Sequence, residues 1–296
     1  MIVISEGRAI QLSGSNGKVQ QKEVCELKSG QEETDTRVVL YASYGAKLGY
    51  EFIRVRSPDS DIFFILLHHV SNIESTILFD TGCGNKRRLL NVIEKAKDLG
   101  QHTCSALMAL HVLTGCDTTS ALKGIGKVKP IKLLQKEEKF EDCLCQLGEF
   151  WDIPEQYIDN VEQFICCLYG FPRFKSIDDV RVHILRRKCE RNGILDPKKN
   201  IDLANLPPCL NSLTQHVKRV NYQVKIWKLA NNNFQEKPSP THHGWVKGEV
   251  GLEPLWSDKN ILPTQLVDLV DRIDSPDTED EDNEYESDSS NNSDME

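Results

Sequence analysis

The stretch that most constrains the fold is LTGCDTTSALKGIGK, residues 113–127. Apolar side chains recur at helical spacing both before and after it, which predicts a helix on each side. Between the two helices stand one acid, Asp117, and a Gly-x-Gly hairpin made by Gly124 and Gly126. Glycines at these positions would permit a tight turn and the close approach of another backbone segment.

The predicted hairpin carries positive charge. Lys123, Lys127 and Lys129 lie around the start of the second helix, and Pro130 fits its first turn. The first N–H groups of a helix have no partner within the helix, and together with the helix dipole they attract anions. The hairpin is therefore expected to bind a phosphate group.

Length and composition bound the class of protein. The chain has 296 residues, of which 39% are hydrophobic, enough for one large domain or two modest ones. It contains no apolar run long enough to cross a membrane and no signal-peptide pattern. Its ten cysteines form no CxxC pair, so we interpret them as reduced thiols. These features predict an intracellular protein, nuclear or cytoplasmic, without a zinc ribbon.

The net charge of −9 is distributed unevenly. Residues 271–296 hold 12 acids and one base, so the remainder of the chain carries a net charge of +2. Such an acidic, polar segment is expected to be disordered and could contact protein partners. The near-neutral remainder leaves nucleic-acid binding open, because local basic patches decide it.

Hydrophobic periodicity predicts an α/β protein with a helical C-terminal half. A short hairpin is expected within residues 1–30, followed by a helix over 32–48. Buried strands are predicted at 52–56, 62–67 and 75–79. From about residue 86 onward the pattern is almost wholly helical, with helices at 143–150, 157–169, 177–187 and 211–229, and a small hairpin is expected between Trp245 and Trp256.

These elements suggest four segments. Residues 1–140 would form the α/β core, with the helix–hairpin–helix element at 103–136. A helical extension would follow at 141–230, then a loop and small aromatic segment at 231–270, and the acidic tail at 271–296.

Five acids occupy positions where a sheet-based site could form. Glu33 and Asp35 open the first predicted helix, Asp59 and Asp61 follow a strand, and Asp117 precedes the hairpin. In open α/β sheets, ligands gather at the carboxyl ends of strands, where these acids would meet. A group of carboxylates without bases is costly unless cations neutralise it, which points to Mg²⁺ or Mn²⁺. Two such ions can promote hydrolysis of a phosphodiester.

Each acid also has an ordinary structural interpretation. Glu33 and Asp35 at a helix start are what capping and the helix dipole alone would favour. Asp59 and Asp61 stand beside a proline and fit a turn, and Asp117 could cap its own loop. The order and spacing of the acids, together with the hairpin, carry more weight than any single one.

These motifs resemble those of the flap endonucleases and related structure-specific 5′ nucleases, which are PIN-like domains with a helix–hairpin–helix element. The matching phrases are Gly-Cys-Asp at 115–117, Gly-Ile-Gly at 124–126, Glu-x-Asp at 33–35 and Asp-x-Asp at 59–61. The resemblance implies a PIN-like α/β core with a central, mostly parallel sheet. It also implies that two divalent metals are bound by Glu33, Asp35, Asp59, Asp61 and Asp117. Nucleic-acid phosphates would be held by Lys123, Gly124, Gly126, Lys127 and Lys129.

The sequence motifs are more similar still to those of a poorly characterised group of PIN-like proteins associated with mobile elements. The chain is similar to that group over roughly residues 1–262. The matching phrases are EETDTR at 32–37, RSPDSD at 56–61, LHVLTGCDTTS at 110–120 and HGW at 243–245. This resemblance implies a nuclease-like protein that acts on DNA or RNA without sequence preference.

One departure leaves two functions open. Proteins of this type usually begin with a strand that ends in aspartate and is followed by a second acid, whereas this chain begins MIVISEGRAIQL. We therefore expect an N-terminally truncated core with an incomplete acidic site. The protein would be a metal-dependent nuclease or its degenerate remnant. Alternatively, it would be a domesticated, non-catalytic module that binds nucleic acid or protein partners.

Overall fold

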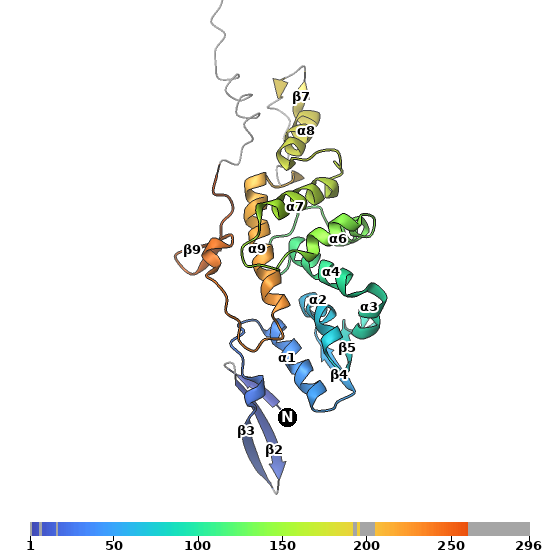
Figure 1. The fold of residues 1–296 in the computed structure, drawn as a ribbon, viewed down its shortest axis with the longest axis vertical. Coiled ribbons are helices and arrows are strands. Elements are labelled where there is room, and N and C mark those ends of the chain that lie inside the picture. Colours follow the sequence, from blue (N-terminus) through green and yellow to red (C-terminus); the bar gives the residue numbers. More distant parts are fainter. Residues whose placement is uncertain (1, 6–7, 16, 192–193, 196–204, 260–296) are drawn as a thin grey trace, which may run out of the picture. The chain divides into compact units, whose positions relative to one another are not determined.

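A computed structural model describes residues 2–5, 8–15, 17–191, 194–195 and 205–259 (Figure 1). The predicted acidic tail at 271–296 lies outside the described residues. Helices occupy α1 Thr34–Lys47, α2 Ser60–His69, α3 Val92–Leu99, α4 Gln101–Leu113, α5 Val128–Leu134, α6 Glu138–Cys145, α7 Glu155–Leu168, α8 Ile177–Cys189 and α9 Leu210–Lys228. Short 3₁₀ turns occur at η1 Cys25–Leu27, η2 Val70–Asn72, η3 Gly84–Lys86 and η5 Pro240–His242.

The strands of the described residues form four small sheets. They are β1 Ile2–Ser5, β2 Arg8–Ser15, β3 Lys18–Glu23, β4 Phe52–Arg56, β5 Thr76–Thr81, β6 Arg88–Asn91, β7 Glu190–Arg191, β8 Ile194–Leu195, β9 Trp245–Lys247 and β10 Leu252–Pro254. The described chain is thus mixed α/β and rich in helix, which confirms the predicted class at that level.

The sheet beside the acids has three strands in the order β4-β5-β6. β4 and β5 run parallel, with Phe52 opposite Thr76, and β6 runs antiparallel to β5, with Leu78 opposite Asn91. The strands predicted at 52–56 and 75–79 are therefore present, but β6 was not predicted. The expected mostly parallel sheet is, among the described residues, a small mixed one.

The strand predicted at 62–67 is wrong, because this apolar run lies in helix α2. Asp59 caps that helix: its carboxylate accepts a hydrogen bond from the Asp61 backbone N–H at 2.8 Å. Ile62, Ile65 and Leu66 are then buried in the core. A short, continuous apolar run fits a buried strand and a buried helix equally well, so periodicity could not separate the two.

At the N-terminus, the expected hairpin is extended by a third strand. β1, β2 and β3 form an antiparallel sheet. The turn-forming composition of residues 13–17 predicts a break there, but residues 13–15 belong to β2. Ala9, Val24 and Leu27 form a small separate cluster against Tyr41 and Tyr44 of α1.

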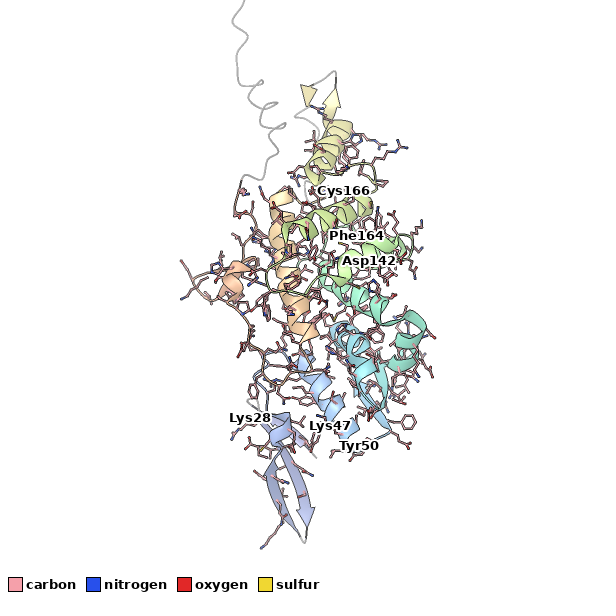
Figure 2. All side chains as sticks on the ribbon, viewed as in Figure 1. Lys28, Lys47, Tyr50, Asp142, Phe164 and Cys166 are labelled. Carbon is pink, nitrogen blue, oxygen red and sulfur yellow. The ribbon has the colours of Figure 1, made fainter. Side chains whose placement is uncertain are left out.

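Helices α4, α6, α7 and α9 gather around one main core (Figure 1). Within it, Phe140 of α6 packs edge-on against Phe164 of α7, with ring centroids 5.1 Å apart. Figure 2 labels Phe164 among the side chains of α7. Trp227 near the end of α9 is 2% exposed and belongs to the same core. No helix among the described residues is long and apolar enough to cross a membrane.

Several predicted helices are present with shifted ends. The helix predicted at 143–150 is mostly wrong, because α6 covers Glu138–Cys145 and residues 146–150 form turns and bends. Gly148 follows in a left-handed turn with φ of 76°, and a Cβ there would lie 2.8 Å from the Lys225 backbone nitrogen. The loop after α6 therefore approaches α9 closely, and only glycine fits this turn. The hairpin expected between Trp245 and Trp256 is confirmed as β9–β10.

Candidate functional site

Three elements bring the five predicted acids to one place. Asp35 lies in the first turn of α1, with Glu33 directly before the helix. Asp59 caps α2 and Asp61 lies in its first turn, while Asp117 stands in the loop after α4. Helix α2 packs against both α1 and α4, so residues far apart in sequence become neighbours.

Asp35 is the electrostatic centre of this acidic cluster. Burial first, and then repulsion from Asp59, Asp61, Glu33 and Asp117, raises the pKa of Asp35 to about 6. The four other predicted acids are thus all close enough to act on one carboxyl group. The side chains of Asp35 and Asp117 make no hydrogen bond or ion pair with the described residues. They remain available to a cation.

Helix α9 holds the Glu33 carboxylate. The Gln223 amide nitrogen donates to both Glu33 carboxylate oxygens, at 2.9 and 3.0 Å, and the Trp227 indole nitrogen donates to Oε2 at 3.2 Å. The Glu33 side chain makes no capping hydrogen bond to α1. Capping therefore does not explain this acid, and a helix from the far end of the described chain orients it.

A buried histidine holds Asp61. The His111 Nε2–H of α4 donates to the Asp61 carboxylate at 2.7 Å, and the His111 and Asp61 side chains are 4% and 7% exposed. The imidazole ring stacks on Phe64 at 4.3 Å between centroids and lies 6.3 Å from the Trp227 ring. Sequence analysis did not select His111. Its position shortly before Asp117, on the inner face of a helix, was the available signal.

The donor chemistry of the acidic cluster fits a hard divalent cation. Only oxygen ligands are present, and their mutual repulsion is what a bound cation would relieve. In the arrangement observed, however, no three His, Cys, Asp or Glu side chains of the described residues stand close enough together to hold a metal ion. A cation would have to draw Asp35, Asp59 and Asp117 inward, because Glu33 and Asp61 already have donors.

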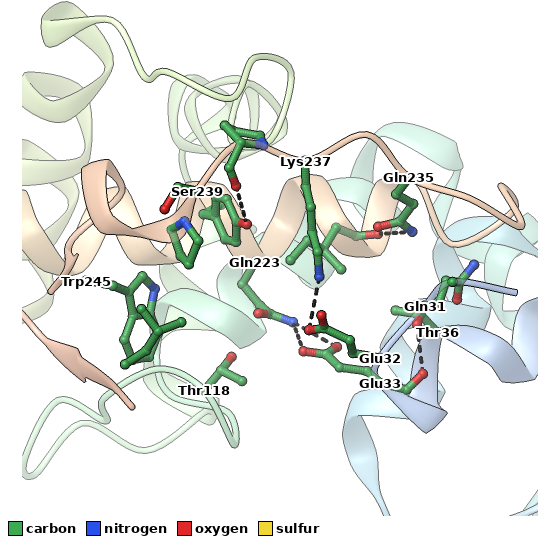
Figure 3. Close-up of a pocket in the computed structure, with 16 residues that line it drawn as sticks. Gln31, Glu32, Glu33, Thr36, Thr118, Gln223, Gln235, Lys237, Ser239 and Trp245 are labelled. Carbon is green, nitrogen blue, oxygen red and sulfur yellow. Dashed lines mark hydrogen bonds and ion pairs between the residues drawn. The ribbon is translucent and has the colours of Figure 1, made fainter. Parts of the chain in front are cut away.

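A cavity of about 540 Å³ opens beside the acidic cluster (Figure 3). Its wall includes Glu33 and also Thr118, the neighbour of Asp117. The far wall comes from the segment after α9, where Lys237 forms an ion pair with Glu32 at 3.1 Å. The Glu33 side of the cluster is therefore reachable from an open space lined mainly by α9 and that segment.

The hairpin residues do not act together as predicted. The Lys127 ammonium turns inward and donates to the carbonyl oxygens of His111 and Gly115, at 2.8 and 2.6 Å, and to Thr114 Oγ1 at 2.9 Å. The expectation that Lys127 points at a phosphate is therefore wrong in this structure. The last carbonyls of α4 lack helical partners, and the lysine satisfies them.

The close backbone approach expected at the Gly-x-Gly pair occurs at Gly115 instead. Gly115 has φ of 107°, and a Cβ there would lie 2.8 Å from the Ala121 Cα. Gly124 has φ of 77°, but a Cβ at Gly124 or Gly126 would meet no atom within 4 Å. Gly124 thus serves the turn itself, and both hairpin glycines leave open space around the backbone.

Three other lysines line a groove along α5. Gly126, Lys127 and Lys129 border a cavity of about 570 Å³, together with Lys132 and Lys136. Lys129 and Lys132 are three residues apart in α5 and so share one side of the helix, and Lys136 follows in the turn after it. All three are exposed, and none forms an ion pair with the described residues. Lys123 borders a different cavity.

A second basic group surrounds a buried acid on the sheet. Asp80 of β5 is fully buried and accepts hydrogen bonds from Arg54, Arg56 and Arg87. Each of the three arginine side chains remains about half exposed. One carboxylate faces three guanidinium groups, so positive charge is left over at the end of β4, close in sequence to Asp59.

Comparison with known proteins adds no assignment: no protein-family model, no curated protein and no solved structure matches this chain.

Proposed function

We propose that the chain is a PIN-like, divalent-metal-dependent nuclease-like protein that binds nucleic acid through phosphate contacts and hydrolyses phosphodiester bonds. One observation carries the proposal. Five acids predicted from sequence order lie close enough together that the other four help to raise the pKa of Asp35 to about 6. Such a concentration of carboxylates destabilises a fold unless it serves a cation or a proton transfer.

Under this proposal, Asp35, Asp59 and Asp117 would hold Mg²⁺ or Mn²⁺, with Glu33 and Asp61 beside them. The bound ions would supply Lewis-acid stabilisation and lower the pKa of a coordinated water. The chain itself orients the acids: Gln223 and Trp227 fix Glu33, and His111 fixes Asp61.

Two basic groups of the described residues fit a polyanionic substrate. The α5 lysines would contact the backbone of one nucleic-acid segment, and the excess guanidinium charge around Asp80 would attract another. Such contacts carry no sequence information, so binding would be sequence-independent and would weaken as salt concentration rises.

The test pairs metal binding with cleavage. Mn²⁺ should raise the melting temperature of the full chain by several degrees, and flap or single-stranded DNA should be cut when Mn²⁺ is present. Asp59→Asn should reduce both effects by tenfold or more and leave the fold intact, because asparagine caps a helix as well as aspartate does. Asp98→Asn is the matched control, since Asp98 is exposed on α3 and, among the described residues, forms an ion pair only with Lys95.

A second function is favoured by a different observation. Glu33 and Asp61 are already hydrogen-bonded, and no three metal-binding side chains converge among the described residues. A non-catalytic module would still bind nucleic acid through the lysine groove but would not bind the metal or cleave phosphodiester bonds. It would bind DNA equally well in EDTA, Mn²⁺ would not change its melting temperature, and Asp59→Asn would leave DNA binding unchanged. That set of results would replace the nuclease proposal with the module.

A further inference from the structure

A third cavity holds two buried polar side chains with unused hydrogen-bonding atoms. It measures about 230 Å³ and is lined by residues of the loop after Asp117 and of α9. His216 and Arg219 of α9 line it, together with Ser120, Tyr169 and Trp256. His216 and Arg219 are one helical turn apart, so their side chains share a face of α9.

His216 presents an unused hydrogen-bond acceptor. Burial lowers the pKa of His216 to about 4, so the ring is neutral at pH 7. Its Nε2–H donates to the Leu113 carbonyl oxygen at 2.9 Å, which leaves a lone pair on Nδ1. Nδ1 is buried and has no hydrogen-bond partner among the described residues. Leaving a buried acceptor unpaired destabilises the folded state, so a ligand that donates a hydrogen bond to it would be favoured.

Arg219 presents unused donors. Only 2% of the residue is exposed, and no carboxylate of the described residues pairs with it. Nη1 donates to the carbonyl oxygens of Gly244 and Leu255, at 2.9 and 2.7 Å. The remaining N–H groups, on Nε and Nη2, have no hydrogen-bond partner among the described residues. A guanidinium group offers five N–H donors, so the two residues that α9 contributes to the lining, His216 and Arg219, have an unused acceptor and unused donors between them.

An aromatic face stands at the same place. The Arg219 guanidinium lies 5.6 Å from the centre of the Trp256 ring, and Trp256 is 62% exposed. Exposed tryptophans provide stacking surfaces for bases. The cavity volume of about 230 Å³ is below the roughly 300–1,000 Å³ typical of drug-sized ligands.

We infer that this pocket, lined by His216, Arg219 and Trp256, binds one unpaired guanine base of a nucleic-acid strand that crosses the Asp117 loop. Guanine offers two adjacent acceptors, O6 and N7, which an arginine contacts in pairs, and its N1–H and N2–H groups can donate to an imidazole nitrogen. A fully ionised phosphate has acceptors only, so it would satisfy Arg219 and leave His216 facing a repelling negative charge. The inference rests on the proposed nucleic-acid function but not on cleavage.

The test measures binding in EDTA, where no cleavage occurs. Guanosine should quench tryptophan fluorescence of the full chain and bind at least tenfold more tightly than adenosine or inorganic phosphate. 7-Deazaguanosine, which lacks the N7 acceptor, should bind about tenfold more weakly than guanosine. A thymidine oligonucleotide with one central guanine should bind more tightly than the same strand with adenine in its place.

Variants connect this binding to the pocket. Trp256→Ala should weaken guanosine binding about tenfold, and Trp256→Phe should restore most of it, because a ring remains for stacking. Phe150→Ala is the matched control, since Phe150 is also 62% exposed and lies outside the pocket lining. A folded Trp256→Ala protein that binds guanosine as the wild type does would overturn the inference.

Two outcomes separate this inference from the nuclease proposal. Equal binding of guanosine, adenosine and phosphate overturns the guanine pocket, even if Mn²⁺-dependent cleavage is observed. Selective guanosine binding supports the pocket, even if Mn²⁺ neither stabilises the chain nor promotes cleavage; in that case only the catalytic proposal fails.

Discussion

Asp35 shows most directly how a single residue records its surroundings. On a free helix it would be an ordinary acid near the N-terminus, stabilised by the dipole. Here burial and four neighbouring carboxylates favour its protonated form and raise its pKa to about 6. The folded state therefore binds more protons than the unfolded state between about pH 4 and pH 6.

Asp35→Asn should reveal that linkage. The free energy of unfolding of the wild type should fall as pH rises from 4 to 6, because Asp35 loses its proton in this window. The asparagine variant should lack that part of the slope and be more stable at pH 7 by about 1 kcal/mol, a modest value because solvent screens a half-exposed carboxyl. Urea unfolding at pH 4, 6 and 7 measures both effects; a variant less stable than the wild type at pH 7 would contradict the cluster.

His111 orients the Asp61 carboxylate through a buried hydrogen bond. His111→Phe would keep the stacking on Phe64 and remove the hydrogen bond, leaving a buried carboxylate without its donor. The expected loss of stability is about 1–3 kcal/mol. A double-mutant cycle with Asp61→Asn isolates the pair: if the two losses simply add, His111 does not act through Asp61.

At the level of elements, the lysines of the helix–loop–helix at 101–134 have two different roles, one structural and one at the groove surface. Lys127 closes the end of α4, whereas Lys132 faces the open groove. Sequence alone grouped the lysines near the hairpin as one phosphate-binding set. The direction of each side chain depends on which carbonyls lie unpaired beneath it, and that is fixed only when α4 and the loop are packed.

Lys127→Met should therefore affect mainly stability, and Lys132→Met mainly DNA binding. Lys127→Met should cost about 2–3 kcal/mol of stability, because a half-buried charged donor is removed from two carbonyl oxygens and a hydroxyl group. Lys132→Met should change stability by less than about 0.5 kcal/mol but weaken DNA binding and reduce its salt slope by about one. Denaturant unfolding and DNA titrations at two salt concentrations measure the contrast, and a stable Lys127→Met protein with weakened DNA binding would reverse the assignment.

At the level of the whole molecule, charge is divided between segments. Residues 271–296, with 12 acids and one base, carry a net charge of −11, and the rest of the chain carries a net charge of +2. Deleting 271–296 should strengthen DNA binding several-fold at about 50 mM salt, because a repelling segment is removed. The gain should vanish near 0.5 M salt, where charges are screened over a few ångströms. Fluorescence anisotropy of a labelled oligonucleotide tests this, and an equal gain at both salt concentrations would rule out an electrostatic origin.

Helix α9 joins distant parts of the chain into one site. Its Gln223 and Trp227 hold Glu33, its His216 binds the end of α4, and its Arg219 reaches the segment around β9. Sequence analysis predicted the helix itself and placed it in a separate helical extension. It gave no sign that polar residues on α9 complete the acidic site, because such contacts span nearly the whole chain.

The sequence by itself determined the local elements and the set of acids. Helical periodicity predicted α1, α7 and α9, alternation predicted β4, and the order of Glu33, Asp35, Asp59, Asp61 and Asp117 suggested a common site. These features depend on neighbours a few residues away, which a sequence displays. Tertiary structure alone decided that residues 62–67 form a helix, that Lys127 turns inward, and that His111 and α9 orient the acids. Burial and hydrogen-bond partners between distant segments fix those choices, and they exist only once the chain is packed.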